Sequence, residues 1–377
     1  MNYRKMGLTG INISTLGFGC MRLPEFEKDN KWYIDEEKAI EMLRQAYKQG
    51  VNYFDTAPYY CHSNSETVLG KVVKAFRGKI YLSTKLPLNE INSSDDFWRL
   101  LNDSLKRLDT DYIDFYHFWA LNRQTFHEKV LKFRLIEEAM KAKEKGLIKY
   151  LSFSFHDDPE VIKEIIDTGK YFSSMLVQYN LLDRKNEKMI EYAFSQGLGI
   201  VIMGPVGGGR LASPTNDLGV KLTINAKSTY ELAFKFVLSN PYVSCALSGM
   251  ENIDMVNNNI NVVNEFTFLT EQEQQQINQS LTTLQKFSDL YCTGCKYCNQ
   301  CPSNIQIHHL FKLYTYYNVY GLKEYTRNAY VKYLANPSNG QVNSCIECGL
   351  CESVCPQKLS IINELKKVHR VLGEKNE

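Results

Sequence analysis

Short apolar runs alternate with segments of helical periodicity over roughly the first 265 residues. The runs lie at Thr15–Gly19, Asn52–Asp55, Lys79–Ser83, Tyr112–His117, Tyr150–Phe153, Met175–Gln178, Gly199–Met203 and Val243–Leu247. Between Glu36 and Gln49 the apolar positions recur at helical spacing, and Gly50 follows. Eight strands that alternate with helices pair in parallel through right-handed crossovers and close into a barrel. An open doubly wound sheet is the alternative, but Gly17-Phe18-Gly19-Cys20 does not supply the G-x-G-x-x-G that it needs after the first strand.

Eight of the eleven cysteines lie in two short runs in the last quarter of the chain. The first run is Cys292, Cys295, Cys298 and Cys301 before Pro302, and the second is Cys345, Cys348, Cys351 and Cys355 before Pro356. The second run has the bacterial iron–sulfur spacing, C-x2-C-x2-C-x3-C-P, in which the fourth cysteine ligates the other cluster. We therefore predict two 4Fe-4S clusters, one held by Cys292, Cys295, Cys298 and Cys355, the other by Cys345, Cys348, Cys351 and Cys301.

Two other uses of these cysteines stay open at this point. Paired C-x2-C units also bind zinc, and two zinc sites would use eight ligands as well. A disulfide framework needs an oxidising compartment; no secretory signal precedes Met1-Asn2-Tyr3, so we expect a reducing, cytoplasmic location. The remaining Cys20, Cys61 and Cys245 are interpreted as ordinary barrel residues.

The length and composition favour one large and one small domain. The chain has 377 residues, is 44% hydrophobic and carries a net charge of +2, which argues against nucleic-acid or membrane partners. No apolar run approaches the roughly 18 residues of a membrane span. We expect an α/β architecture with a TIM barrel over residues 1–285, closed by a helix at Gln272–Leu290. A small, mainly helical, ferredoxin-like domain with two clusters would occupy residues 286–377, and metal clusters would stabilise its small core. The oligomeric state is left open.

Polar residues stand at the carboxyl ends of successive strands, where barrels of this type place active sites. Asp55 ends the second strand, Lys85 the third and His117 the fourth, and Tyr60 follows Asp55 by five residues. A buried charge is costly unless paired, so Asp55 and Lys85 are natural partners. Taken alone, Tyr60 would be a surface aromatic, His117 a satisfied buried histidine and Asp55 a loop cap.

This constellation resembles the aldo/keto reductase family. The stretch Asp55-Thr56-Ala57-Pro58-Tyr59-Tyr60, with Ser65-Glu66, is similar to the family signature, and Lys85 and His117 match its other catalytic positions. The resemblance covers about residues 3–265, and the whole chain is similar to a branch with a ferredoxin-like tail. It implies hydride transfer between a nicotinamide and a small carbonyl or alcohol substrate. Tyr60 would be the general acid and base, its ordinary pKa near 10 lowered by Lys85; Asp55 would hold Lys85, and His117 would orient the carbonyl.

The resemblance also implies a dinucleotide, NAD(H) or NADP(H), bound without a doubly wound fold. Ser154 and Gln178 would hold the nicotinamide amide. The glycine-rich stretch after the seventh strand would hold the pyrophosphate, with a flexible turn as the alternative. Its candidate residues are Gly204, Pro205, Gly207, Gly209 and Arg210, and Gly249 and Asn259 follow the eighth strand.

Several positions depart from the family pattern. Phe155 replaces an asparagine, Met203 replaces the aromatic that stacks on nicotinamide, and Asn258 replaces an acidic residue. No Arg or Lys stands between Ser248 and Val263 to bind a 2′-phosphate, and Glu251 would repel one. These departures favour NAD(H) and leave open a branch with weakened dinucleotide binding.

A hydride carries two electrons and a 4Fe-4S cluster passes one, and no flavin-binding pattern stands out to split the pair. Three hypotheses follow: a carbonyl reductase whose tail is structural or serves an electron partner, a module that docks a ferredoxin- or flavodoxin-type donor, and an enzyme of substrate radical chemistry. The four matched catalytic positions favour the first. Phe118, Trp119 and Trp32 are candidate substrate-pocket aromatics, with core packing as the alternative, favoured for Trp32.

Overall fold

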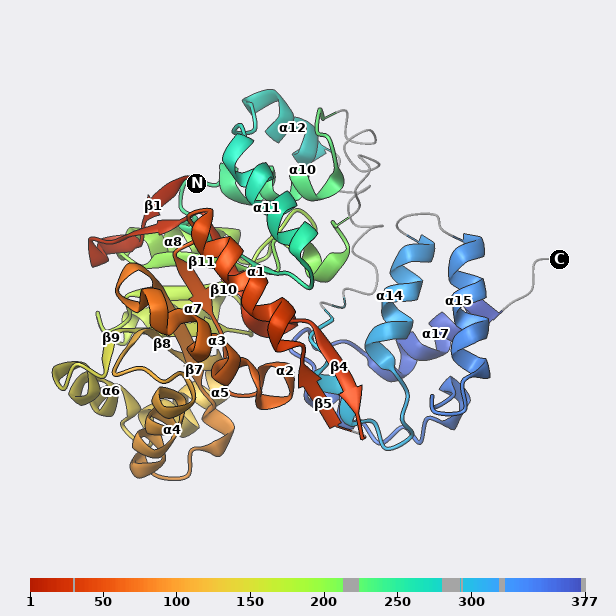
Figure 1. The fold of residues 1–377 in the computed structure, drawn as a ribbon, viewed down its shortest axis with the longest axis horizontal. Helices are drawn as coiled ribbons and strands as arrows, with labels where there is room; N and C mark the ends of the chain where they lie inside the picture. Colours follow the sequence, from red (N-terminus) through yellow and green to blue (C-terminus); the bar gives the residue numbers. More distant parts are fainter. Residues whose placement is uncertain (30, 213–223, 280–291, 293, 319–322, 374–377) are drawn as a thin grey trace. The chain divides into compact units, whose positions relative to one another are not determined.

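A computed structural model covers the chain and describes residues 1–29, 31–212, 224–279, 292, 294–318 and 323–373 (Figure 1). The chain divides into two compact units. The first comprises Met1–Asn180, Arg184–Pro205 and Phe234–Phe268, and the second comprises Leu181–Asp183, Val206–Ala233 and Leu269–Glu377. The predicted boundary between residues 285 and 286 lies outside the described residues.

The first unit holds a closed barrel of eight parallel strands, as predicted. In barrel order these are β3 (Leu16–Gly19), β6 (Tyr53–Asp55), β7 (Tyr81–Leu86), β8 (Ile113–Leu121), β9 (Ile148–Phe155), β10 (Ser174–Gln178), β11 (Gly199–Met203) and β12 (Cys245–Gly249). Every predicted strand is present, so the open-sheet alternative is wrong. β7 and β8 run three and four residues beyond their predicted ends, Ser83 and His117. Lys85 and His117 therefore lie within strands rather than at their last positions.

Helices alternate with these strands. They are α1 (Glu36–Lys48), α2 (Tyr60–Ser63), α3 (Ser65–Val73), α4 (Ser94–Arg107), α5 (Arg123–Thr125), α6 (Leu135–Glu144), α7 (Glu160–Asp167), α8 (Glu187–Ser195), α10 (Thr229–Ser239) and α11 (Ile253–Glu265). A π-helical turn spans Phe126–Leu131, and 3-10 turns η1 to η4 and η6 span Gly7–Thr9, Cys20–Arg22, Lys74–Lys79, Leu88–Glu90 and Gly207–Gly209.

The sequence explains where the longer helices begin and which face they bury. Asp35 caps α1 by accepting a hydrogen bond from the Lys38 amide, and Ser93 with Asp96 forms a capping box at α4. The buried residues of α1 are Ala39, Met42, Leu43 and Ala46, the positions that the helical spacing predicted. The apolar face of α1 is thus its buried face, as for a helix that covers a barrel.

Two antiparallel hairpins were not predicted. β1 (Tyr3–Lys5) pairs with β2 (Asn12–Ser14), and β4 (Glu25–Lys28) pairs with β5 (Lys31–Ile34). Met6 and Ile13 at the first hairpin are fully buried against barrel residues such as Tyr53. The second hairpin is mostly exposed, so it lacks the apolar alternation by which a half-buried strand is identified.

The cysteine-rich part of the second unit is helical, as predicted. Its elements are α12 (Glu271–Gln279), η7 (Tyr297–Gln300), α14 (Ile307–Asn318), α15 (Lys323–Ala335), η8 (Val342–Ser344), α16 (Leu350–Ser353) and α17 (Ile361–Gly373). The predicted helix at Gln272–Leu290 is present as α12 up to Gln279, and the rest of it lies outside the described residues.

α14, α15 and α17 bury a shared core that includes Leu310, Phe311, Tyr330 and Leu365. Tyr330 and Tyr333 are both buried there; Tyr330 pairs with His369, and Tyr333 donates to the Gly340 carbonyl. The prediction that tyrosines between the two cysteine runs serve packing is confirmed for these two. Across the described part of the chain, no helix has the length and apolar character that a membrane crossing requires.

Candidate active site and cysteine hollows

Asp55, Lys85 and His117 lie on three neighbouring strands, β6, β7 and β8, toward their carboxyl ends. The Lys85 Nζ donates to Asp55 Oδ2 at 2.6 Å and to the Thr56 carbonyl at 2.7 Å, and Ser83 Oγ donates to Asp55 Oδ1 at 2.7 Å. The strand register sets Lys85 opposite His117. All three side chains are buried. The expected pairing of Asp55 with Lys85 is present, and it offsets the cost of burying both charges.

Tyr60 brings a phenol ring to this buried ion pair. The Lys85 Nζ lies 4.7 Å from the centroid of the Tyr60 ring, and the Trp119 ring meets the Tyr60 ring edge-on at 5.8 Å between centroids. Tyr60 is partly exposed while Lys85 is buried.

The turn that follows Tyr60 is conformationally unusual. Cys61, His62 and Ser63 have φ angles of 50°, 52° and 67°, three non-glycine residues in succession in the left-handed region. Each such residue costs about 1–2 kcal/mol. The Asn64 Nδ2 donates to the carbonyls of Cys61 and His62 at 3.1 and 3.2 Å, which compensates part of this cost.

Burial sets the charge states around the phenol. Burial lowers the pKa of Lys85, and the Asp55 carboxylate opposes that change. Burial, followed by the Lys85 cation, lowers the pKa of His117 to about 3. Within the described residues, no well-formed hydrogen bond engages either ring nitrogen of His117, and the nearby Phe153 backbone only partly opposes the fall in its pKa. At neutral pH His117 is therefore a neutral imidazole with one N–H, which suits it to a polar ligand.

A second buried network adjoins the Asp55–Lys85 pair and gives Ser65 and Glu66, the other residues of the sequence signature, a structural role. The Glu66 carboxylate is buried, accepts from Thr84 Oγ1 at 2.6 Å and pairs with Arg107 Nε at 2.6 Å. Ser65 Oγ lies 2.8 Å from Thr56 Oγ1. Thr56 and Thr84 directly adjoin Asp55 and Lys85 in the chain, so this network fixes the backbone that carries the ion pair.

Six of the predicted dinucleotide residues belong to the first unit: Ser154, Gln178, Gly204, Pro205, Gly249 and Asn259. The Ser154 Oγ accepts from the Ala120 amide at 2.8 Å, and Asn259 Nδ2 donates to Ser248 Oγ at 3.1 Å. Gly204 has φ +64°, and a Cβ there would lie 2.7 Å from Gln178 Nε2. The positive φ favours glycine at this position, at the end of β11 and beside the Gln178 amide at the end of β10.

Gly207, Gly209 and Arg210 belong to the second unit. The amides of Gly209 and Arg210 donate to the carbonyls of Val206 and Gly207 within the loop, so they are already engaged. Arg210 is buried, and its cation lowers the pKa of Cys292, which burial raises to about 11. No local sequence pattern indicates that Arg210 lies near Cys292.

The three candidate pocket aromatics have different surroundings. Phe118 is fully buried and packs edge-on against Phe172, so it is a core residue. Trp119 packs on the Tyr60 ring and belongs to the site. Trp32 is 42% exposed and stacks on His62, so the favoured interpretation of Trp32 as core packing is wrong.

Arg22 is a residue that the sequence reasoning missed. Its Nη1 lies 3.4 Å from Glu251 Oε1, and its Cδ would lie 3.1 Å from a Cβ on Gly249. No Arg or Lys stands between Ser248 and Val263 in the sequence, but β3 pairs with β12, and that pairing brings η2, with Arg22, next to Glu251. Only the barrel closure could have revealed this neighbour.

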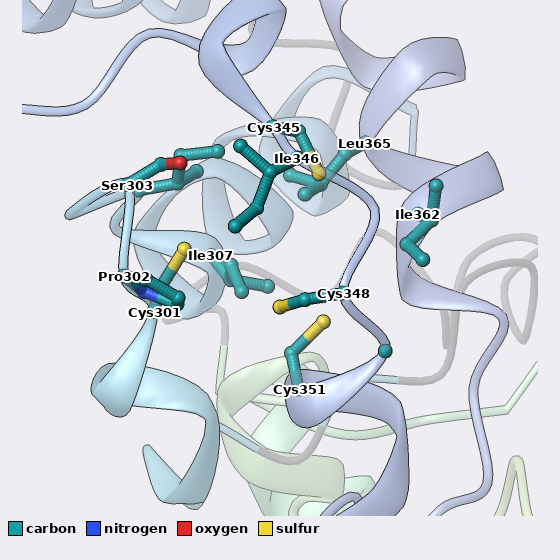
Figure 2. A pocket seen from close by; sticks show the side chains of 12 residues that line it. Cys301, Pro302, Ser303, Ile307, Cys345, Ile346, Cys348, Cys351, Ile362 and Leu365 are labelled. Carbon is teal, nitrogen blue, oxygen red and sulfur yellow. The ribbon is translucent and has the colours of Figure 1, made fainter.

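Two hollows in the second unit are each lined by four cysteines. Cys345, Cys348, Cys351 and Cys301 line one, and Cys292, Cys295, Cys298 and Cys355 line the other. Figure 2 shows the first of these, with the four sulfurs around the hollow. Each hollow therefore takes three cysteines from one run and the fourth from the other. Among the described residues, no three or more His, Cys, Asp or Glu side chains converge closely enough for a single metal ion.

The two runs also repeat one backbone conformation. The second cysteine of each run lies between two residues of positive φ. Gly294 and Lys296, both with φ 64°, flank Cys295. Glu347 and Gly349, with φ 53° and 73°, flank Cys348. The third residue after each fourth cysteine, Asn304 or Lys358, is left-handed too and donates its amide to that cysteine's carbonyl. α14 and α17 then begin six residues after Cys301 and Cys355. The internal repeat is thus longer than the two cysteine runs.

Comparison with known proteins agrees with both halves of this description. Residues 15–282 match the Aldo/keto reductase family, and residues 291–360 match the 4Fe-4S dicluster domain. The match to the dicluster domain favours iron–sulfur clusters over the zinc and disulfide alternatives.

The uncharacterized oxidoreductase YqkF of Bacillus subtilis is 28% identical over 306 residues, 72% of this chain and 94% of that protein. L-galactose dehydrogenase of Arabidopsis thaliana is 25% identical over 71% of this chain and 89% of its own length. The holo form of aldo-keto reductase AKR11C1 from Bacillus halodurans superposes with a TM-score of 0.64 and 30% identity, covering 74% of this chain and 96% of that one. The chain belongs to the aldo/keto reductase family of oxidoreductases and continues, after its barrel, into a 4Fe-4S dicluster domain.

Proposed function

We propose that the first unit catalyses reversible NAD(P)H-dependent reduction of a small carbonyl substrate, with Tyr60 as general acid and base. The observation that carries this proposal is the buried Lys85–Asp55 pair, with the Lys85 Nζ 4.7 Å from the centroid of the Tyr60 ring. A cation so placed favours the phenolate over the phenol and makes the proton easier to give up. The family match supports the reaction class.

Each residue has a defined part in this proposal. Tyr60 would donate its proton to the carbonyl oxygen in reduction and recover it in alcohol oxidation. Lys85 would stabilise the phenolate left behind, and Asp55 would keep Lys85 in place. Neutral His117 would donate a hydrogen bond to the carbonyl oxygen and orient it. A bound nicotinamide would supply or accept the hydride.

The residues around the strand ends fit a nicotinamide in part. Ser154 and Gln178 lie at the ends of adjacent strands, and Gly204, with its positive φ, lies against the Gln178 amide. Phe155 is buried and cannot replace the amide of the family asparagine, and Met203 offers a thioether in place of an aromatic face. Glu251 continues to favour NAD(H), although Arg22 lies close enough to weaken its repulsion of a phosphate.

We further propose that the two hollows hold two 4Fe-4S clusters in the reciprocal arrangement. The support is the donor set, four cysteine sulfurs in each hollow with apolar residues such as Ile307 between them. Such clusters exchange one electron each. Iron and sulfide analysis after anaerobic purification tests their presence. Titration with NADH and NADPH, followed in the visible spectrum, tests whether the clusters and the dinucleotide exchange electrons.

A second candidate function is electron exchange with a ferredoxin- or flavodoxin-type protein. Cys348 is the exposed one of the four cysteines that line its hollow, and the neighbouring Ile346 and Leu350 are 67% and 54% exposed. A small apolar surface at a cluster ligand suits a transient electron-transfer contact. Stopped-flow mixing with reduced ferredoxin would test it: rapid bleaching of the clusters in the native protein, slowed in I346E and L350E, supports the candidate, and equal rates would remove it.

A further inference from the structure

The hairpin β4–β5 contacts the turn that carries Tyr60. The Trp32 ring stacks on the His62 ring with centroids 5.5 Å apart and an interplanar angle of 11°. His62 Nδ1 donates to Glu25 Oε1 at 2.8 Å; the Glu25 side chain is 8% exposed and that of His62 is 42% exposed. Trp32 comes from β5 and Glu25 from β4, so both strands of the hairpin hold one imidazole. Figure 1 shows β5 beside α2.

His62 is the central residue of the left-handed turn that follows Tyr60. Such backbone persists only where surrounding groups over-determine it. From inside, Asn64 holds the carbonyls of the turn, and the Cys61 Sγ lies 3.5 Å from the Cys20 carbonyl. On the solvent side, the hairpin fixes His62 through the Trp32 ring and the Glu25 carboxylate. A change in the turn would alter the direction of the Tyr60 side chain, because Tyr60 directly precedes it.

We propose that Trp32 and Glu25 are positioning residues for Tyr60. They hold His62 through a ring stack and a hydrogen bond, and through His62 they keep the left-handed turn that follows Tyr60 and places its ring beside Lys85. The inference rests on the proposed function, because its consequence is the geometry of proton transfer at Tyr60. Small displacements of a reacting group lower catalytic rates steeply, so a residue that touches neither substrate nor cofactor can control the rate.

Hydrogen–deuterium exchange on the full-length, cluster-loaded protein tests the mechanical link without any substrate. W32A and E25A are expected to speed exchange in peptides that cover residues 60–68, where the Asn64 amide donates to the Cys61 carbonyl. W32F should restore slow exchange because it keeps a ring on His62. Y33A is the matched control: Tyr33 lies on the same strand and is also 42% exposed, but it stacks on Phe26. Exchange that is equal in W32A and the native protein, or equally fast in Y33A, would overturn the proposal.

Kinetics with 4-nitrobenzaldehyde as the probe and NADH or NADPH as the reductant provide the second readout. W32A should lower kcat about tenfold or more with little change in the KM for the dinucleotide, and W32F should recover most of it. If Y60F abolishes turnover and W32A does not change it, the positioning role fails and the proposed function stands. If Y60F leaves turnover intact, the proposed function fails, and a W32A exchange effect then reports only a structural contact.

Discussion

The strand-end site and the cysteine hollows reach their chemistry by opposite routes. At the strand ends the polypeptide itself completes the arrangement, because Lys85, Asp55 and Ser83 satisfy one another. In the hollow of the first run, burial raises the pKa of Cys292 to about 11 and that of Cys298 to about 12. Iron binds thiolates, so the metal must stabilise the form that the apolar hollow disfavours. One site is organised by the fold, and the other would be organised by the clusters that we propose for it.

The largest expected effect is that of Y60F, which should impair the strand-end site and leave the cysteine hollows unchanged. Y60F should lower kcat for carbonyl reduction by about 10²–10⁴-fold, because the general acid is lost. Iron content and the visible spectrum should not change, since the fold of the hollows does not depend on this hydroxyl. Steady-state kinetics and iron analysis on the same preparation measure both.

Y59F is the matched control for that change. Tyr59 is the adjacent tyrosine, and its hydroxyl pairs with Glu90 rather than with the buried ion pair. Y59F should keep native turnover. Native turnover in Y60F, or an equal loss in Y59F, would contradict the role given to Tyr60.

The reciprocal arrangement of the cysteines makes a sharp prediction for paired substitutions. Cys298 and Cys355 line the same hollow, whereas Cys298 and Cys301 line different ones. C298A/C355A should therefore keep about half of the iron, and C298A/C301A should lose nearly all of it. Iron analysis and electron paramagnetic resonance of the reduced proteins provide the measurement. The reverse pattern would show that each run binds its own cluster.

The buried imidazole predicts a pH dependence that belongs to the barrel alone. The pKa of His117 is lowered to about 3 by burial, against an ordinary value near 6.5. Between these two values the unfolded chain binds the extra proton, so stability falls as pH decreases below about 6.5, by up to about 1.4 kcal/mol per pH unit. Above about pH 6.5, neutral His117 makes its full contribution to the stability of the fold.

H117N removes this titration. Urea unfolding midpoints from pH 5 to 7, followed by barrel tryptophan fluorescence, should show a shallower pH dependence in H117N than in the native protein. The difference between the two proteins cancels any acid effect on the clusters. Parallel pH profiles would mean that His117 carries no buried deprotonated state.

The smallest expected effect concerns the choice of dinucleotide. E251Q removes the charge that would repel a 2′-phosphate, and E251R adds a guanidinium able to bind one. The ratio of kcat/KM for NADPH over NADH should rise in E251Q and rise further, by about tenfold or more, in E251R. Unchanged ratios in both variants would place the adenosine phosphate away from β12.

Local sequence patterns were sufficient to predict the barrel strands, the sharing of the cysteines and one buried ion pair. Alternating apolar runs and helical periodicity located all eight barrel strands, because burial on a strand or helix face leaves a repeating signature in the chain. The spacing of the cysteines anticipated which sulfurs share a hollow, since the cluster geometry constrains the spacing directly. Asp55 and Lys85 were paired in advance on electrostatic cost alone.

Other features leave no local signature. The hairpin β4–β5 is mostly exposed, so no apolar alternation identifies its strands, and the stack of Trp32 on His62 joins residues 30 positions apart. Arg22 meets Glu251 only because the barrel closes β3 against β12. Arg210 follows a glycine run typical of phosphate loops, yet its charge acts on Cys292. The left-handed turn after Tyr60 consists of Cys61, His62 and Ser63, and it contains no glycine from which positive φ angles could be predicted.

The sequence by itself determined the order of the elements, the chemistry available at the strand ends and the division of the cysteines between two hollows. Each of these follows from residue type and spacing, which act over a few residues. Tertiary structure decided which distant side chains share one environment: Trp32 of the hairpin against His62, Arg22 beside Glu251 after β12, and the buried surroundings that hold His117 neutral. Those depend on desolvation and close packing, which exist only once the chain has closed on itself.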